Sequence, residues 1–320
     1  MLHNSQKDFI GRHIGVSDKD QQKMLKDLNF KSLDQLINNT VPEKIQFKGE
    51  LNIGESNSEY EALRKLKAIS KKNQIYSNFI GMGYYGTYTP YVILRNILEN
   101  PGWYTSYTPY QPEVAQGRLE MLLNFQQMIV DFTGMDIANA SLLDEGTAAA
   151  EAIGLSHRLN KNDCNLVFVS DNCHPQTIDV IQTRAEPMGL KVLVGDETKV
   201  LDQLKEDLVC GIIQYPGTLG DIKDPSESIS KIHKKNGKAI LACDLLSLAK
   251  LKTPRELGAD IAVGSSQRFG IPMGYGGPHA AFFATKDEYK RSMPGRIVGV
   301  SVDRHGNKAY RLSLQTREQH

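Results

Sequence analysis

His174, Asp244 and Gln267 each follow a short apolar run that predicts a strand. If these strands are parallel, their carboxyl ends lie at one edge of a sheet, where ligands bind. A histidine that stacks on a ring and an aspartate that faces a pyridine nitrogen are what a pyridoxal phosphate site requires. Each residue alone has a simpler interpretation, a surface histidine or an aspartate that caps a strand. The order and spacing of the three residues are stronger evidence for such a site than any one of them alone.

A second candidate site lies in the segment Asp144-Glu145-Gly146-Thr147, which precedes a run of small residues and predicts the start of a helix. Backbone N–H groups, a threonine hydroxyl and the positive end of the helix dipole can converge on a phosphate at such a place. Gly146 and Thr147 are therefore candidate phosphate-binding residues. A plain helix start capped by Asp144 explains the same pattern equally well.

Residues 81–86 read GMGYYG and match the glycine pattern of dinucleotide-binding proteins. That pattern functions only between a strand and a helix, with an acidic residue about 20 positions later on a second strand. Here residues 87–90 read TYTP, which delays any helix, and no apolar second strand follows. Nicotinamide binding is therefore the weakest of the alternatives.

Tyrosines are concentrated between residues 76 and 110, which hold eight of the 13 in the chain. They are interleaved with glycine, threonine and proline and do not recur at helical spacing. This pattern is typical of a well-packed surface loop, or of a rigid, hydroxyl-rich lining for a ligand pocket or a subunit interface. The sequence alone does not favour either interpretation.

The elements that must position these residues follow a regular alternation from about residue 145. The predicted strands are 166–170, 191–194, 211–215, 238–243, 260–264 and 280–284. The predicted helices between them are 175–188, 200–208 and 225–235. Such alternation predicts an α/β fold with a mainly parallel sheet, covered by helices on both faces.

Composition excludes several classes of protein. With 320 residues, 40% of them hydrophobic, the chain can form one large domain with an appendage. Its net charge of +1 offers no field for a nucleic-acid backbone or an anionic membrane. Its apolar runs are far shorter than the roughly 20 residues of a membrane-spanning helix. The first ten residues lack the apolar core of a secretory signal, so we expect a cytoplasmic protein.

The cysteines Cys164, Cys173, Cys210 and Cys243 are too far apart for a C-x-x-C pair. Three of them lie in or beside predicted strands. Buried reduced thiols are therefore favoured over metal ligands or disulfides. We expect no structural metal.

Long motifs extend through the whole chain. They read FIGRHIG near the start, then GMGYYGTYTPYVILRNILENPGWYTSYTPYQPEVAQGRLEMLLNFQ, ANASLLDEGTAAAEA and GADIAVGSSQRFGIPMGYGGPHAAFF. From about Phe9 to His320 the chain resembles the amino-terminal half, or first subunit, of the glycine cleavage system P-protein family, pyridoxal-phosphate-dependent glycine decarboxylases.

The resemblance implies a fold of the aspartate-aminotransferase-like kind, pyridoxal phosphate fold type I. Residues 1–72 would form a helical amino-terminal arm, and residues 73–145 tyrosine- and glycine-rich loops with a connecting helix. Residues 146–320 would form the large domain. The small carboxyl-terminal domain typical of this fold would be absent, as if the chain were cut short.

The resemblance also implies an oxidoreductase of glycine catabolism. The family decarboxylates glycine with pyridoxal phosphate and transfers the aminomethyl group to the lipoyl arm of H-protein. In the family, the carboxyl-terminal half carries the Schiff-base lysine. This chain has Gln267 at the corresponding position, and an amide cannot form an imine. We therefore expect no activity from the chain alone.

The cofactor would be held covalently by the lysine-bearing half. In this chain, Gly146, Thr147, His174 and Asp244 would be a vestigial cofactor cradle. The expected partners are the lysine-bearing half, lipoylated H-protein and glycine.

The family's amino-terminal half lends loops to the catalytic pocket at the interface with its partner. The residues expected at that shared pocket or its entrance are Tyr84, Tyr85, Thr87, Tyr107, Thr108, Pro109, Tyr110 and Gln111. Two alternatives to this role stay open. One is a non-catalytic structural or regulatory subunit with the same fold, and the other is an atypical pyridoxal enzyme that is active without the lysine.

Overall fold

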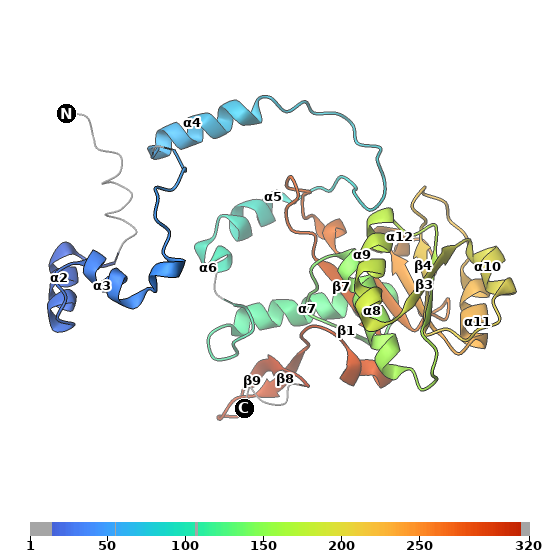
Figure 1. The fold of residues 1–320 in the computed structure, drawn as a ribbon. Coiled ribbons are helices and arrows are strands. Elements are labelled where there is room, and N and C mark those ends of the chain that lie inside the picture. The colour runs from blue at the N-terminus through green and yellow to red at the C-terminus, as the bar shows by residue number, and fades with distance from the viewer. Residues whose placement is uncertain (1–14, 55, 106–107, 315–320) are drawn as a thin grey trace. The chain divides into compact units, whose positions relative to one another are not determined.

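A computed structural model describes residues 15–54, 56–105 and 108–314 (Figure 1). The contacts within it divide the chain into two compact units, Met1–Ser77 and Asn78–His320. Most of the helices and strands belong to the second unit. The division of the chain at residues 72 and 145 stays a prediction.

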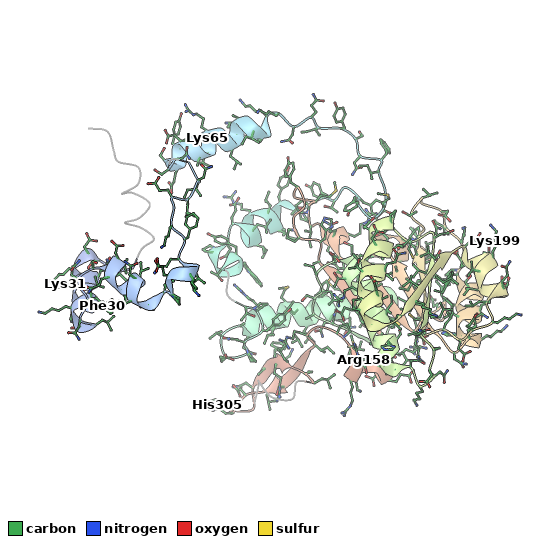
Figure 2. The ribbon with its side chains drawn as sticks, viewed as in Figure 1. Phe30, Lys31, Lys65, Arg158, Lys199 and His305 are labelled. Atoms are coloured by element: carbon green, nitrogen blue, oxygen red, sulfur yellow. The ribbon has the colours of Figure 1, made fainter. Side chains whose placement is uncertain are left out.

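The first unit is helical, and its helices bury little apolar surface. Its elements are α2 (Asp18–Asp27), α3 (Leu33–Thr40), the short 3-10 helix η1 (Glu43–Ile45) and α4 (Glu59–Ser70). Leu25 of α2 is buried, whereas α4 has no buried residue and its side chains, including Lys65, project from the helix (Figure 2). Burial within this unit therefore contributes little to the stability of its helices.

Within the described residues, the second unit contains a sheet of seven strands. In spatial order they are β1 (Ile137–Ala138), β7 (Ala281–Thr285), β6 (Ile261–Ser265), β5 (Lys238–Cys243), β4 (Cys210–Tyr215), β2 (Leu166–Ser170) and β3 (Lys191–Gly195). A separate antiparallel hairpin consists of β8 (Val298–Val302) and β9 (Lys308–Leu312).

The prediction of a mainly parallel sheet is confirmed. Strands β2 to β6 pair in parallel, and each lies within one residue of its predicted bounds. Strand β7 is the exception, because it runs antiparallel to both β6 and β1. The helix predicted over 200–208 was misplaced, since α10 spans Glu197–Gln203 and begins at the capping residue Asp196.

Helices cover both faces of the sheet (Figure 1). They are α7 (Gln116–Thr133), α8 (Glu145–Leu159), α9 (Pro175–Ala185), α11 (Ser226–Lys234) and the single-turn α12 (Leu245–Leu248). Side chains of β2 alternate between the faces: Val167 and Val169 pack with α8 and α9, whereas Phe168 packs with α7 and α11. Because both faces are buried, the strands read as continuous apolar runs.

Helices or turns follow several strands directly at the carboxyl edge of the sheet. Helix α9 begins after β2, α12 after β5, and the 3-10 helix η4 (Gln267–Phe269) after β6. Remaining short elements are α5 (Tyr91–Ile93), the π-helix η2 (Leu94–Leu98), α6 (Pro101–Tyr104), η3 (Glu186–Met188) and η5 (Asp287–Ser292). No helix in the described ranges is both long and apolar enough to cross a membrane.

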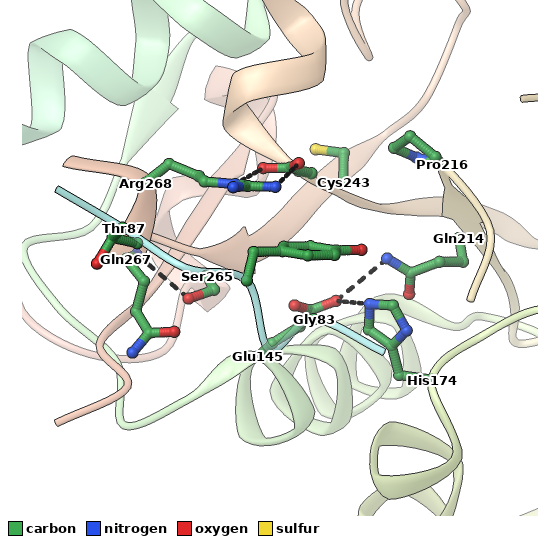
Figure 3. Close-up of a pocket in the computed structure, with 12 residues that line it drawn as sticks. Gly83, Thr87, Glu145, His174, Gln214, Pro216, Cys243, Ser265, Gln267 and Arg268 are labelled. Atoms are coloured by element: carbon green, nitrogen blue, oxygen red, sulfur yellow. Dashed lines mark hydrogen bonds and ion pairs between the residues drawn. The ribbon is translucent and has the colours of Figure 1, made fainter. Parts of the chain in front are cut away.

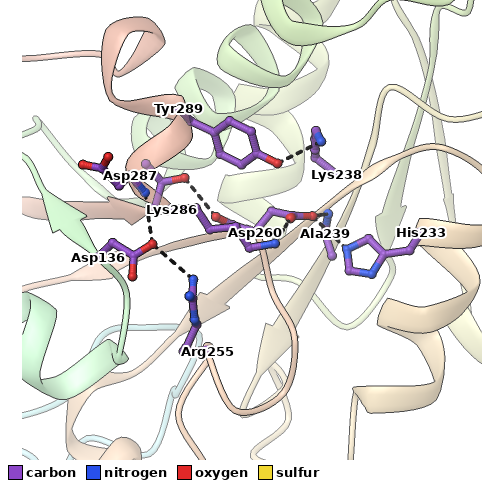
Figure 4. A network of polar contacts seen from close by, with 10 residues as sticks. Asp136, His233, Lys238, Ala239, Arg255, Asp260, Lys286, Asp287 and Tyr289 are labelled. Carbon is purple, nitrogen blue, oxygen red and sulfur yellow. Dashed lines mark hydrogen bonds and ion pairs between the residues drawn. The ribbon is translucent and has the colours of Figure 1, made fainter.

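A polar network lies at the opposite, amino edge of the sheet (Figure 4). The buried carboxylate of Asp260 accepts hydrogen bonds from His233 and from the backbone N–H of Ala239, both at 2.8 Å, and pairs with Lys286. Burial alone would raise the pKa of Asp260. The hydrogen bonds and the Lys286 charge outweigh burial and lower this pKa to about 2. The carboxylate therefore stabilises the fold above its unfolded pKa near 4, and this contribution is lost as the pH falls to about 2.

We expect Asp260→Asn to lower the free energy of unfolding by about 2 kcal/mol at neutral pH, because Lys286 and His233 lose the buried anion with which they pair. Denaturant unfolding of the chain measures this loss. Asp202→Asn is the matched control, since Asp202 is an exposed partner of Lys231 and such pairs contribute at most about 1 kcal/mol. Equal losses in the two variants would contradict a stabilising role for the Asp260 network.

Candidate functional site

A small pocket lies at the carboxyl edge of the sheet (Figure 3). Its volume is about 20 Å³, room for roughly one water molecule. The lining residues come from the ends of β4, β5 and β6, from the loops after β2 and β6, from the start of α8, and from segment 81–90. They are Gly83, Tyr85, Thr87, Glu145, His174, Gln214, Pro216, Cys243, Asp244, Ser265, Gln267 and Arg268.

Asp244 and Arg268 line the pocket and form a two-point ion pair, and Arg268 is labelled in Figure 3. Arg268 donates from Nε to Oδ1 of Asp244 at 2.9 Å and from Nη2 to Oδ2 at 2.8 Å. The guanidinium carbon lies 4.2 Å from the centre of the Tyr85 ring. Burial raises the pKa of the Tyr85 hydroxyl, and the Asp244 charge adds to that effect. Such planar pairing beneath an aromatic ring suits arginine and not lysine.

His174, Glu145 and Gln214 form the other side of the pocket. His174 is buried, and its Nδ1 lies 3.1 Å from the hydroxyl of Thr218. Gln214 donates from Nε2 to Oε1 of Glu145 at 3.3 Å, while its own buried Oε1 has no hydrogen-bond partner among the described residues. A half-turn of this amide would let its oxygen accept a hydrogen bond from a protonated Glu145.

Burial favours the uncharged form of both ionisable groups on this side. It raises the pKa of Glu145 to about 7, with further raising by the charges of Asp244 and Asp144. It lowers the pKa of His174 to about 4. Between these two values the carboxyl is protonated and the imidazole is neutral. The 3.9 Å contact between them is therefore not an ion pair in that range.

Gln267 lies at the end of this pocket that follows β6. The residue is buried, and its backbone N–H donates to the hydroxyl of Ser265 at 3.2 Å. Its side-chain amide reaches the backbone oxygen of Pro278 at 3.5 Å, a long contact for a hydrogen bond. The glutamine is thus held inside the pocket, yet it has no group that can bond covalently to an aldehyde.

The predicted phosphate-binding residues lie at the start of α8, beside this pocket. Thr147 uses its backbone N–H to cap the helix through Asp144, at 2.7 Å. Gly146 lines a neighbouring, more open pocket of about 200 Å³ together with Tyr84 and Thr177. Because the Asp144 carboxylate already accepts the Thr147 N–H at the positive end of the helix, the start of α8 is poorly suited to an anion.

The residues predicted at the shared interface lie in two separate places in the structure. Tyr85 and Thr87 line the small pocket, and Tyr84 packs edge-on against His279 beside it, with ring centres 5.6 Å apart. The other group lies elsewhere: Thr108, Tyr110 and Gln111 line an open cavity of about 610 Å³ next to the β8–β9 hairpin, and Pro109 lies between them in the chain. Tyr107 lies outside the described residues.

Sequence reasoning assigned no role to Arg268, Glu145 or Gln214. Glu145 was visible in the motif of residues 144–147, but a carboxylate in the first turn of a helix is ordinarily a surface group. Gln214 was visible as a polar residue inside an apolar strand. Arg268 was visible beside Gln267 after the predicted strand 260–264, but its partners Asp244 and Tyr85 are distant in the sequence, so its pairing could not be predicted.

The pocket does not fit pyridoxal phosphate in this arrangement. Its volume of about 20 Å³ is far smaller than the cofactor requires. The Asp244 carboxylate, the candidate partner for a pyridine nitrogen, is already paired with Arg268. Gln267 offers no amine. The vestigial cofactor role of Gly146, Thr147, His174 and Asp244 stays a prediction.

Comparison with known proteins identifies the family. The family model described as "Glycine cleavage system P-protein" matches residues 11–320. The chain belongs to the glycine cleavage system P-protein family. The resemblance seen in the sequence motifs is therefore confirmed.

Curated members of the P-protein family match this chain along its length. One from Pelagibacter ubique, named glycine dehydrogenase (decarboxylating), is 82% identical over 320 residues, which cover 100% of this chain and 33% of the relative. Another of that name, from Nostoc punctiforme, is 60% identical over 98% of this chain and 32% of its own length. The chain thus spans about a third of the curated relatives it matches.

Solved structures agree with the predicted fold class. The crystal structure of glycine decarboxylase (P-protein) of the glycine cleavage system, in inhibitor-bound form, has a TM-score of 0.86 and 33% identity. The match covers 95% of this chain and 70% of that one. A sphingosine-1-phosphate lyase from Burkholderia pseudomallei shares the fold at 12% identity, with a TM-score of 0.57 over 84% of this chain and 67% of its own. The aspartate-aminotransferase-like fold is therefore confirmed.

We expect Glu145→Gln to make the chain more stable than the parent at alkaline pH. The raised pKa of Glu145 means that its stabilising, protonated state is present at low pH and is lost as the pH rises through about 7. The difference in free energy of unfolding between Glu145→Gln and the parent should increase by about 2 kcal/mol, in favour of the variant, between pH 5 and pH 8. Thermal or denaturant unfolding at both pH values measures it. Glu186→Gln, on the surface, should show no such trend, and a trend of equal size there would refute the assignment.

Proposed function

We propose that this chain is the lysine-free part of a glycine decarboxylase and acts only when joined to a lysine-bearing half. The observation that carries the proposal is Gln267, which is buried in the pocket at the end of β6. Its amide nitrogen is not nucleophilic enough to bond to an aldehyde carbon. The closed pocket around it supports the same conclusion.

The reaction of the assembled enzyme is proposed from the family. It is the decarboxylation of glycine, with pyridoxal phosphate held covalently by the lysine-bearing half. The aminomethyl group then passes to the lipoyl arm of H-protein. A location in the cytoplasm stays a prediction.

The part played by this chain is to complete the pocket of its partner. Segment 81–90 presents Tyr84, which is 38% exposed, and fixes Thr87 through a hydrogen bond of 2.8 Å to the backbone oxygen of Ile271. Tyrosine combines a rigid apolar ring with one hydroxyl, which suits the enclosure of a small polar substrate. Thr108, Pro109, Tyr110, Gln111 and the undescribed Tyr107 are proposed for the same interface or its entrance.

We expect the purified chain to release no carbon dioxide from glycine, even with pyridoxal phosphate and H-protein present, because it lacks the amine. Addition of a lysine-bearing half should restore release, measured with carboxyl-labelled glycine. Each half assayed alone is the control. Turnover by this chain alone would refute the proposal and favour an atypical pyridoxal enzyme.

We expect Tyr84→Ala to lower kcat/KM of the assembled enzyme about tenfold or more, because the ring and hydroxyl proposed to enclose substrate are lost. The steady-state rate of glycine decarboxylation measures the effect. Tyr60→Ala, on the exposed face of α4, is the control. Unchanged rates in both variants would favour the alternative of a purely structural or regulatory subunit.

A further inference from the structure

The small pocket is filled by side chains of the chain itself. We propose that Tyr85 and Arg268 are its built-in occupant: they exclude a planar aromatic ligand and fix segment 81–90 at the carboxyl edge of the sheet. The idea that this segment positions Tyr84 for the lysine-bearing half rests on the proposed function. The occupancy itself depends only on contacts within this chain.

The charge on Asp244 is neutralised within the chain. Both of its oxygens receive hydrogen bonds from Arg268, and Oδ1 also accepts from the backbone N–H of Leu246 at 3.1 Å. An incoming ring N–H would have to displace the guanidinium. That would leave a positive charge without its partner at a site where both side chains are about one-fifth exposed. Arg268 therefore occupies the position beside Asp244 that a positively charged group of a ligand would take.

The aromatic ring of Tyr85 fills space in the same pocket. It lies half-buried against the Arg268 guanidinium, at 4.2 Å from ring centre to Cζ, and lines the pocket. A ring stacked on a guanidinium gains from both dispersion and the cation–π attraction. With this ring in place, only about 20 Å³ remains in the pocket. Tyr85 therefore takes the space of a planar ligand.

The backbone next to Tyr85 covers His174. A Cβ atom added to Gly83 would lie 3.2 Å from Cδ2 of the imidazole, and this glycine has a φ of +85°. The backbone therefore lies against the ring at a distance that only glycine tolerates easily. The imidazole is 3% exposed, so an external ring has no access to it.

Hydrogen bonds fasten the segment on both sides of Tyr85. Before it, Gln176 donates from Nε2 to the backbone oxygen of Met82 at 2.7 Å. After it, the hydroxyls of Thr87 and Thr89 donate to the backbone oxygens of Ile271 and Gly270. Tyr85 therefore belongs to a segment that is fastened on both sides. Its effective concentration at the pocket is high, so a free ligand competes poorly with it.

The first test supplies the missing amine and asks whether the pocket accepts a cofactor. In Gln267→Lys, the new amine could condense with the aldehyde of pyridoxal phosphate and release water, and borohydride would reduce the C=N bond to a stable amine. We expect no adduct at position 267 by peptide mass mapping. Gln267→Lys combined with Tyr85→Gly and Arg268→Ala should give an adduct approaching one per chain.

The matched control for the triple variant carries Gln267→Lys with Tyr88→Gly and Arg291→Ala, which change exposed residues. It should behave like Gln267→Lys alone. A stoichiometric adduct in Gln267→Lys alone would overturn the proposal. So would a missing adduct in the triple variant, if its circular dichroism and melting temperature match those of the parent.

A second measurement covers the case in which the triple variant fails to fold. Arg268→Lys keeps the charge but removes the two-point pairing and most of the stacking. We expect hydrogen exchange of the amides in segment 82–89 to become about tenfold faster, with β4 and β5 unchanged. Unchanged exchange in the segment would overturn the proposal. Neither test uses a partner subunit or glycine. Failure of these tests would therefore not bear on the proposed function, which the carbon dioxide release assay tests separately.

Discussion

The sheet is buried on both faces, and this constraint decides where charged groups can lie. Val167 and Phe168 point into opposite helix layers, and neither layer has room for an unpaired charge. Carboxylates therefore gather where the strands end. Asp244 and Glu145 lie at the carboxyl edge, whereas Asp260 lies at the amino edge. The pocket and the network that stabilises the sheet are thus separated by the length of the strands.

The sequence predicted the central strands well because burial on both faces requires continuous apolar runs, as in β2 and β5. It could not predict that β7 runs antiparallel, since an apolar run is the same in either direction. With two residues, β1 is too short to give a periodic signal. The hairpin strand β8 alternates between more and less buried side chains, a weak pattern that went unassigned.

The site was predictable in part because its residues follow strands that the sequence predicts. His174, Asp244 and Gln267 line one pocket because each follows a strand that ends at the same edge. The contact between Tyr85 and Arg268 had no such signal, because an irregular loop brings Tyr85 back over the sheet. The family resemblance indicated the segment of Tyr85, but it did not indicate which side chain would turn inward and which, like Tyr84, would stay accessible.

The order of the strands also bears on how the chain folds during synthesis. Strand β7 lies between β1 and β6, and Ile137 pairs with Thr285. At roughly 5–20 residues per second, the ribosome needs roughly 1–4 s to pass from the end of β6 at Ser265 to the end of β7 at Thr285. Until then, the exposed edge of β6 has no neighbour on that side, and such an edge can pair with other chains. A nascent chain that has completed β6 but not β7 therefore exposes an edge that can lead to aggregation.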